Sequence, residues 1–420
     1  MAPGVITPVS PLHGASASGV DLTSKAIENK LQKDGTDING TTKPAELDAS
    51  KLIYNYTKDP RPVPDEATAV AGTETICTDH MITAKWTAAD GWSAPELRPY
   101  GALSIMPTAS CLHYATECFE GLKAYRGFDG KLRLFRPDCN ARRLLMSSAR
   151  ISLPGFAPAE LERLVLALVA ADAPRWLPRS RPGSFLYLRP ALIGTQAQLG
   201  VQAPSEALLF VTAGFMRRVD APPGGMRLLT SPEGQVRAWA GGFGHAKVGA
   251  NYGPSLLATR EARGRGFMQV LWLYGPEAYC TEAGASNFFV VWRPRDAGAR
   301  PQLVTAPLDD GLILDGVTRR SILQLARERL GDELDVVERR YTIDEVLEAE
   351  REGRLVESFA TGTAYFVTPV SLVHHRGKEV SFDMGSGEGG KYTLALKKWM
   401  KDIMYGGEDH PWGVVVPEKP

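Results

Sequence analysis

The chain has 420 residues, of which 44% are hydrophobic, and its 48 basic side chains balance 48 acidic ones. This composition is typical of globular proteins and excludes the disordered and fibrous classes. A formal net charge of zero argues against a nucleic-acid-binding protein, because such proteins need excess Lys and Arg to neutralise phosphates. No apolar run reaches the roughly 18 residues that a membrane helix needs, so no membrane-spanning helix is predicted.

The cysteines indicate a reducing compartment. They form no close C-x-x-C pair and no plausible disulfide framework for a chain of this length. The five cysteines are Cys77, Cys111, Cys118, Cys139 and Cys280.

Residues 1–64 are predicted to form a mobile N-terminal arm. They are rich in Ser, Thr, Gly, Asp and Pro, and no arginine precedes Arg61. The segment lacks the basic start and apolar block of a secretory signal, and it carries too many acids for a mitochondrial transit peptide. We therefore expect a cytoplasmic protein, with a mitochondrial location left open.

The rest of the chain shows alternating helix and strand patterns. Asp138 is the expected N-cap of the first long helix, and Thr342 begins a capping-box pattern with Glu345. Helices are predicted over residues 140–150, 158–172, 255–263, 318–330, 342–350 and 392–405, and strands over 185–188, 208–211, 270–274, 287–292 and 355–359.

A turn-forming segment divides these elements into two groups. Pro222-Pro223-Gly224-Gly225 follows several charged residues, which is typical of a linker. The sequence therefore predicts a mixed α/β protein with a smaller domain over residues 65–216, a linker over 217–226 and a larger domain over 227–420.

Two motifs suggest sites that their surroundings do not support. Gly385–Gly390 matches G-x-G-x-x-G but follows no clear strand, so we interpret it as a flexible surface loop. His374-His375 has no Cys, Asp or Glu cluster at ligand spacing, and we interpret it as a solvated turn. No metal site is predicted.

Lys247 is the strongest candidate for a reactive residue. It lies among small and turn-forming residues, just before a helix predicted to begin near Ser255. An exposed loop lysine is one interpretation of this pattern. The alternative is a lysine in a tight, glycine-lined pocket, where burial lowers its pKa and makes the amine nucleophilic.

Three other segments favour the interpretation of Lys247 as an enclosed lysine. Glu282 precedes an apolar strand and could place a carboxylate at the edge of a buried site. Gly316-Val317-Thr318 opens a helix, whose first N–H groups can bind an anion. Thr361–Ala364 follows a strand and offers hydroxyl and amide groups to a second face of a phosphate.

The order of these segments resembles that of the branched-chain amino-acid aminotransferases, which are fold-type IV pyridoxal-phosphate enzymes. The resemblance runs from Asp79-His80 to the last predicted helix and implies the two-domain fold of the D-amino-acid-aminotransferase-like proteins. It rests on the blocks Leu112–Tyr114, Phe119–Gly127, Tyr187–Pro190, Leu199–Val201, Leu271–Gly275 and Gly316–Arg319.

This resemblance implies pyridoxal 5′-phosphate as the cofactor. Lys247 would form the Schiff base with it and move the proton between substrate Cα and cofactor C4′. Glu282 corresponds to the carboxylate that faces the pyridine nitrogen, and Tyr252 to the phenol that bonds the 3′ oxygen. The implied phosphate-binding residues are Arg143, Val317, Thr318 and Thr363.

The resemblance also implies a substrate site and a homodimer. Leu199 and Val201 correspond to a loop that reaches into the neighbouring subunit's pocket. The expected reaction transfers the amino group of L-leucine, L-isoleucine or L-valine to 2-oxoglutarate. Another amino acid or an (R)-amine as substrate is the alternative. The implied substrate-binding residues are Tyr114, Phe119, Tyr187, Arg189 and Ala364.

The sequence departs from the family pattern at several positions. Asp315 replaces a proline before the phosphate-binding turn, where an acid would repel the phosphate unless it points away. Ala250 replaces a glycine, and Ala285 replaces a pocket threonine of animal relatives. Tyr365 and Thr368 occupy the positions of a redox C-x-x-C in some animal relatives, so no thiol switch of that type is expected.

Overall fold

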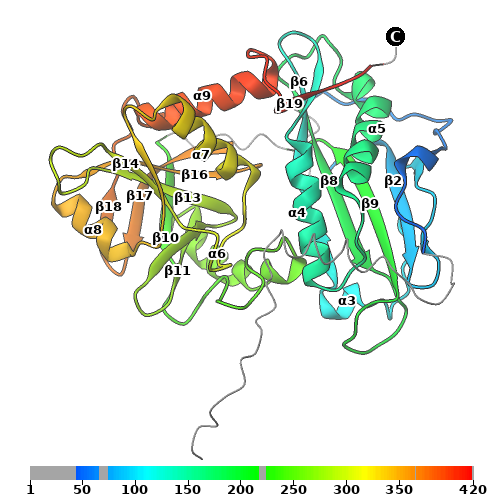
Figure 1. The fold of residues 1–420 in the computed structure, drawn as a ribbon, viewed down its shortest axis with the longest axis horizontal. Coiled ribbons are helices and arrows are strands. Elements are labelled where there is room, and N and C mark those ends of the chain that lie inside the picture. The colour runs from blue at the N-terminus through cyan, green and yellow to red at the C-terminus, as the bar shows by residue number, and fades with distance from the viewer. Residues whose placement is uncertain (1–43, 66–73, 217–223, 365, 419–420) are drawn as a thin grey trace, which may run out of the picture. The chain divides into compact units, whose positions relative to one another are not determined.

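A computed structural model describes residues 44–65, 74–216, 224–364 and 366–418 of the chain. In these ranges the strands form two mixed β-sheets with helices packed against them (Figure 1). This arrangement confirms the predicted mixed α/β class. The predicted linker lies largely outside the described residues, because 217–223 are not among them.

The first sheet contains most of the strands from the first half of the chain and one strand from the C-terminal end. Helices α4 (Pro137–Arg150) and α5 (Pro158–Trp176) pack against it, and α5 buries Leu164 and Leu168 in the core. The strand order is β1 (Ile53–Tyr54), β4 (Glu96–Pro99), β2 (Cys77–Thr87), β9 (Glu206–Gly214), β8 (Phe185–Gly194), β6 (Leu122–Arg126), β7 (Leu132–Phe135) and β19 (Gly413–Val416), with β3 (Gly91–Trp92) paired to β2 and β5 (Glu117–Phe119) paired to β8.

The start of α4 differs from the prediction. Arg136 is the N-cap and Pro137 is the first helical residue, so Asp138 lies inside the first turn and the prediction that it caps the helix was wrong. Proline suits the first helical position, because its fixed φ favours the helix and its missing N–H would have no helical partner. Asp138 pairs instead with Arg142, one turn later on α4.

The second sheet is built from the chain after residue 226. Thr342 forms the predicted capping box with Glu345 at the start of α8. The strand order is β12 (Tyr279–Ala283), β11 (Gln269–Tyr274), β10 (Met226–Thr230), β17 (Phe366–His375), β16 (Leu355–Gly362), β13 (Ser286–Trp292), β14 (Gln302–Thr305) and β15 (Asp335–Glu338), with β18 (Lys378–Ser381) paired to β17; the helices are α6 (Ser255–Gly264), α7 (Val317–Arg329), α8 (Ile343–Arg351) and α9 (Lys391–Tyr405).

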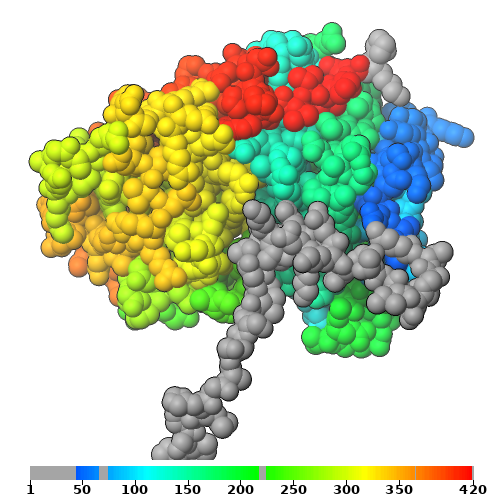
Figure 2. Space-filling model, in the orientation of Figure 1, coloured from blue at the N-terminus to red at the C-terminus, as the bar shows by residue number. Residues whose placement is uncertain are grey.

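Helix α9 links the two sheets. It contacts β16 and β17 of the second sheet as well as β6 and β7 of the first. In the space-filling view α9 is the red segment that runs along the upper surface, beside elements of both sheets (Figure 2). The chain then continues into β19, which pairs with β7 in antiparallel register.

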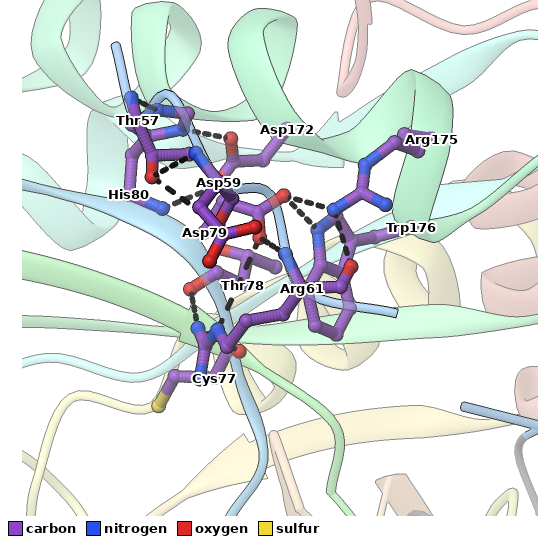
Figure 3. A network of polar contacts seen from close by, with 10 residues as sticks. All are labelled: Thr57, Asp59, Arg61, Cys77, Thr78, Asp79, His80, Asp172, Arg175 and Trp176. Atoms are coloured by element: carbon purple, nitrogen blue, oxygen red, sulfur yellow. Dashed lines mark hydrogen bonds and ion pairs between the residues drawn. The ribbon is translucent and has the colours of Figure 1, made fainter. Parts of the chain in front are cut away.

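Residues 44–65 pack against the first sheet, although their composition predicted a mobile arm to residue 64. Strand β1 pairs with β4, and the Thr57 N–H donates to His80 Nε2 at 2.9 Å. The Arg61 N–H donates to Asp79 Oδ1 at 2.9 Å, and His80 is bonded in turn to Asp172 on α5 (Figure 3). The composition did not indicate this packing, because only a few apolar side chains, Leu47 among them, reach the core and buried polar side chains supply the other contacts.

Both misleading motifs have structural roles. The glycine-rich segment is a turn leading into α9, and a Cβ at Gly390 would collide with Glu357, whose carboxylate accepts the Thr393 N–H at 2.5 Å. His374 and His375 lie in β17, so the interpretation as a solvated turn was wrong. His375 is buried, with Nδ1 3.0 Å from Thr230 Oγ1.

The C-terminal end is held by a buried arginine, which yields a stability prediction. Fully buried Arg126 donates to Leu177 O at 2.6 Å and to both carboxylate oxygens of Glu418. We expect Glu418→Ala to lower the free energy of unfolding by about 3 kcal/mol, because it leaves a buried cation without its carboxylate. Urea unfolding measures this loss.

The control is Glu408→Ala, which breaks the more exposed ion pair with Arg329. Its expected cost is at most about 1 kcal/mol. Equal losses for the two variants would contradict the role assigned to the Arg126–Glu418 pair.

Candidate active site

The segment that carries Lys247 is anchored by the first sheet and by α4. The Lys247 N–H donates to Ser147 Oγ at 2.8 Å, and its carbonyl accepts the Phe119 N–H at 3.1 Å. Asn251 holds the same segment from within, because its Nδ2 donates to Phe243 O and Ala246 O. These bonds fix the backbone of Lys247 outside any helix or strand.

The amine of Lys247 points at an aromatic pair. Nζ donates to Tyr252 Oη at 2.9 Å and lies 4.9 Å from the centre of the Phe119 ring. The two rings contact each other, with their centres 5.1 Å apart. Lys247 is half-buried, so of the two interpretations open for it the structure favours the enclosed lysine over the exposed one.

Glu282 on β12 is buried and fully partnered. Its Oε1 accepts the Leu314 N–H at 3.0 Å and Asn287 Nδ2 at 3.2 Å, and its Oε2 lies 2.8 Å from Arg237 Nε. Burial raises the pKa of Glu282, while the charges of Arg237 and Lys247 oppose that shift. The ionisation of this carboxyl therefore depends on Arg237.

Arg143 on α4 is held by a second buried carboxylate. Its Nε and Nη2 donate to Glu120 at 2.6 and 2.8 Å, and its Nη1 donates to Asp315 O at 2.8 Å. Burial alone would raise the pKa of Glu120, but Arg143 and Lys247 outweigh it and the pKa lies below its ordinary value. Asp315 O, which accepts from Arg143, directly follows Leu314, whose N–H donates to Glu282, so Arg143 and Glu282 lie at one site.

The start of α7 contributes backbone donors. Val317 and Thr318 are buried in its first turn, where the helical N–H groups have no partner within the helix. Gly316 precedes them, and a Cβ there would collide with Asn287 Oδ1. Asp315 forms an ion pair with Arg320, which neutralises the acid that the sequence placed beside the expected phosphate.

The predicted substrate residues fall into three groups. The Arg189 guanidinium lies 4.7 Å from the centre of the Phe119 ring, and its Nη2 donates to Tyr187 Oη at 3.3 Å. Tyr114 Oη accepts the Gly200 N–H at 3.0 Å. Thr363 and Ala364 lie half-buried in the turn between β16 and β17, where Lys123 Nζ is 3.5 Å from Ala364 O.

The structure thus brings most predicted residues together and leaves two outside. Phe119 contacts Lys247, Tyr252 and Arg189, so it connects the Lys247 amine to the predicted substrate-binding residues. Leu199 and Val201 are 59% and 90% exposed and reach this site only through the bond between Gly200 and Tyr114. Among the described residues of this single chain, Leu199 and Val201 do not line the predicted substrate site.

The sequence analysis missed Arg237, Glu120 and Asn287. Arg237 precedes the glycine-rich stretch before Lys247, and Glu120 lies inside a block already noted for its resemblance. For Arg237 and Glu120, the available signal was an isolated charged residue among small or apolar neighbours. Their partners could not be identified, since each ion pair joins elements far apart in the chain.

The described ranges lack both a cluster of metal ligands and a membrane-spanning helix. In those ranges, no group of three or more His, Cys, Asp or Glu side chains is arranged to hold a metal ion. Likewise, no helix within them has the length and apolar character to cross a bilayer.

Residues 117–373 match the family described as amino-transferase class IV. The chain belongs to the class IV aminotransferases. Enzymes of this class use pyridoxal phosphate. The match covers more than half of this aminotransferase and includes Lys247, Glu282 and the start of α7.

Relatives with known names show to which group of class IV aminotransferases the chain belongs. The mitochondrial branched-chain-amino-acid aminotransferase of Schizosaccharomyces pombe is 43% identical over 374 residues, covering 88% of this chain and 86% of its own. The cytosolic one of Saccharomyces cerevisiae is 42% identical over 384 residues, covering 89% and 99%. The aminotransferase therefore belongs to the branched-chain-amino-acid aminotransferase family, which confirms the resemblance of its motifs. Both compartments occur among the relatives, as the localisation prediction allowed.

A solved structure supports the fold. The branched-chain amino acid aminotransferase of Thermobaculum terrenum, in its PLP-form, has a TM-score of 0.62 and 23% identity to this aminotransferase. The similarity covers 81% of this chain and 98% of that one.

The residues of the site fit pyridoxal phosphate. Lys247 offers an amine, Glu282 a buried carboxylate and the start of α7 a set of amide donors. Thr361 Oγ1 is buried without a hydrogen-bond partner in the described chain, as expected of a site that receives a polar ligand. The three cations Lys247, Arg143 and Arg237 outnumber the carboxylates of Glu120 and Glu282 by one, which favours an anion.

The Arg237–Glu282 pair predicts a change in pH dependence. Removing the cation in Arg237→Met raises the pKa of Glu282 further, because burial is then opposed by fewer positive charges. A carboxyl that acts as an anion works only above its pKa, so the acid edge of the pH–kcat/KM profile should move upward by about one unit or more.

Arg150→Met is the matched control. Arg150 lies in the same region, against the Phe243 ring, and binds Gly242 O rather than a carboxylate. Its acid edge should remain in place. An unchanged edge in Arg237→Met, with Arg150→Met equally unchanged, would contradict the role of Arg237.

Proposed function

We propose that this aminotransferase transfers the amino group of L-leucine, L-isoleucine or L-valine to 2-oxoglutarate, with pyridoxal phosphate bound at Lys247. The observation that carries the proposal is the enclosed Lys247 amine, bonded to Tyr252 at one site with Glu282 and Arg143. Membership of the branched-chain-amino-acid aminotransferase family supports it.

The cofactor, when bound, supplies an aldehyde that accepts the substrate's amine and a ring that takes up the electron pair left when Cα loses its proton. Lys247 holds the cofactor before the substrate arrives and then moves the proton through its freed Nζ. Tyr252 orients this amine by accepting its hydrogen bond. The Phe119 ring covers one side and excludes water from the proton's path.

Glu282 and Arg237 work together on the ring nitrogen. The proposal assigns Glu282 to hold a proton on that nitrogen, for which the carboxyl must be an anion. Arg237 favours the anion by its charge, and Leu314 N and Asn287 Nδ2 fix the carboxylate from the other oxygen. Buried Glu282 can then act without rearranging.

The phosphate group is assigned to the start of α7, Arg143 and Thr363. The amides of Val317 and Thr318 donate to it, and the positive end of the helix dipole attracts it. Arg143 adds a charged donor from the first sheet's side of the site. A phosphate held in this way fixes the position of the cofactor relative to Lys247.

The substrate residues suit both an apolar side chain and a glutamate side chain. Aromatic Phe119 and Tyr187 offer apolar walls, while Arg189 beside them can pair with a distal carboxylate. Ala285, which is small and exposed in the turn between β12 and β13, leaves room for a different aliphatic or aromatic substrate. The small side chain of Ala285 is the feature that favours this alternative substrate.

Replacement of Lys247 tests the proposal. Wild-type protein titrated with pyridoxal phosphate should turn yellow, and borohydride should fix the cofactor to the chain. Lys247→Ala should lose both the fixed cofactor and transamination, because it removes the amine that the proposal assigns to the cofactor's aldehyde. Exposed Lys85→Ala is the control and should behave as wild type.

A panel of 2-oxo acids with glutamate as donor then tests the substrate. The branched-chain 2-oxo acids should give the highest kcat/KM. A wild-type protein that stays colourless at saturating cofactor would overturn the proposal, and a preference for aromatic 2-oxo acids or amines would replace its substrate class.

A homodimer is part of the proposed function. Leu199 is 59% exposed and Val201 is 90% exposed. Gly200 between them donates its N–H to Tyr114, a predicted substrate-binding residue. Two apolar side chains at the tip of such a loop suit burial in the neighbouring subunit's site.

Sedimentation tests the dimer. The wild-type chain of 45.6 kDa should sediment at twice its mass. Val201→Asp should raise the dimer dissociation constant about tenfold or more, because it buries an unpaired charge. Phe128→Ser, at a position 62% exposed in another loop, should leave the dimer intact. A monomeric wild type would contradict the assignment of Leu199 and Val201.

A further inference from the structure

Glu120 is a buried carboxylate to which the proposed mechanism gives no task. It has no exposed surface and follows Phe119, whose N–H is bonded to Lys247 O. Its own N–H donates to Pro190 O at 2.8 Å, so its backbone is held by β8. The carboxylate therefore projects from a rigid position, one residue after the Phe119 N–H that bonds to the Lys247 segment.

The carboxylate of Glu120 receives several donors. Oε1 accepts Arg143 Nε at 2.6 Å, and Oε2 accepts Arg143 Nη2 and Asn140 Nδ2, both at 2.8 Å. The Gly121 N–H adds a bond at 3.1 Å. Asn140 and Arg143 lie three residues apart on α4, which places both on the face of the helix toward Glu120.

A count of donors shows what remains on Arg143. A guanidinium has five N–H groups. Glu120 accepts one from Nε and one from Nη2, and Asp315 O accepts one from Nη1. Within the described chain, one N–H on each Nη is thus left for another acceptor. We call these two N–H groups the outer edge of Arg143, and charged guanidinium donors of this kind suit a phosphate.

We propose that Glu120 is the positioning residue that aims the outer edge of Arg143 at the cofactor's phosphate. It does not touch the cofactor. Its two bonds set the plane of the guanidinium, and Asp315 O sets the third corner. Without the carboxylate, Arg143 would keep its charge but lose its orientation. This inference rests on the proposed function, because it requires a phosphate at the site.

The experiment compares two ligands that differ only in the phosphate group. Pyridoxal phosphate and pyridoxal are titrated separately into the apoprotein, and the absorbance change gives both dissociation constants. In Glu120→Gln the dissociation constant for pyridoxal phosphate should rise about tenfold or more, since a charge-assisted orientation is lost. The constant for pyridoxal should change less than about twofold, because Lys247 and Glu282 are untouched.

Two further variants make the test specific. Glu357→Gln replaces another buried glutamate, which caps α9 away from Lys247, and should leave the ratio of the two constants unchanged. Glu120→Asp keeps the charge but withdraws it from Nε and Nη2, and should give an intermediate loss for the phosphorylated ligand alone. It also serves if Glu120→Gln fails to fold.

The outcomes separate the inference from the proposed function. Equal weakening of both ligands, or no change in either, would overturn the role of Glu120 and leave the aminotransferase proposal in place. A wild-type protein that binds neither ligand would overturn both. A loss confined to pyridoxal phosphate is the result we expect.

Discussion

Buried charge is the constraint on which the site depends. Lys247, Arg143, Arg237, Glu120 and Glu282 are gathered where an unpaired ion would cost several kcal/mol of unfolding free energy. The chain meets this cost by pairing each arginine with one glutamate and completing each carboxylate with amide donors. Such pairs contribute little net stability, so the reason to build them is the field that they create around the lysine amine.

The site is built from both sheets. Arg143 comes from α4 on the first sheet and bonds to Asp315 O just before α7 on the second. Glu120 follows β5 of the first sheet, whereas Glu282 lies on β12 of the second. Each ion pair therefore belongs to one side of the site, and the bond from Arg143 to Asp315 O connects the two sides. Helix α9 and β19 strengthen the connection by returning from the second sheet to the first.

Local signals in the sequence predicted several elements, and the resemblance to a known family predicted the roles of the site residues. The small residues around Lys247, the capping box at Thr342 and the helix start at Val317 need only a few neighbouring residues to be recognised. The predicted strands at 185–188 and 208–211 lie inside longer strands, because the pairing of β8 with β9 extends each one beyond its apolar run.

The rest depended on partners distant in the chain. Residues 44–65 are packed in part because His80 and Asp79 accept their N–H groups, and no local pattern reveals an acceptor that lies about twenty residues away (Figure 3). Arg237 and Glu120 were missed for the same reason. Asp138 was misplaced because Pro137 starts the helix one position before it, and a proline signal outweighed an acidic one.

A crystal structure grown with pyridoxal phosphate is the most direct test of the account. We expect continuous electron density from Lys247 Nζ to the cofactor's C4′ carbon, with a Glu282 oxygen within hydrogen-bond distance of the ring nitrogen. A cofactor bound elsewhere, or a Lys247 side chain that ends in solvent with Glu282 turned away, would contradict it.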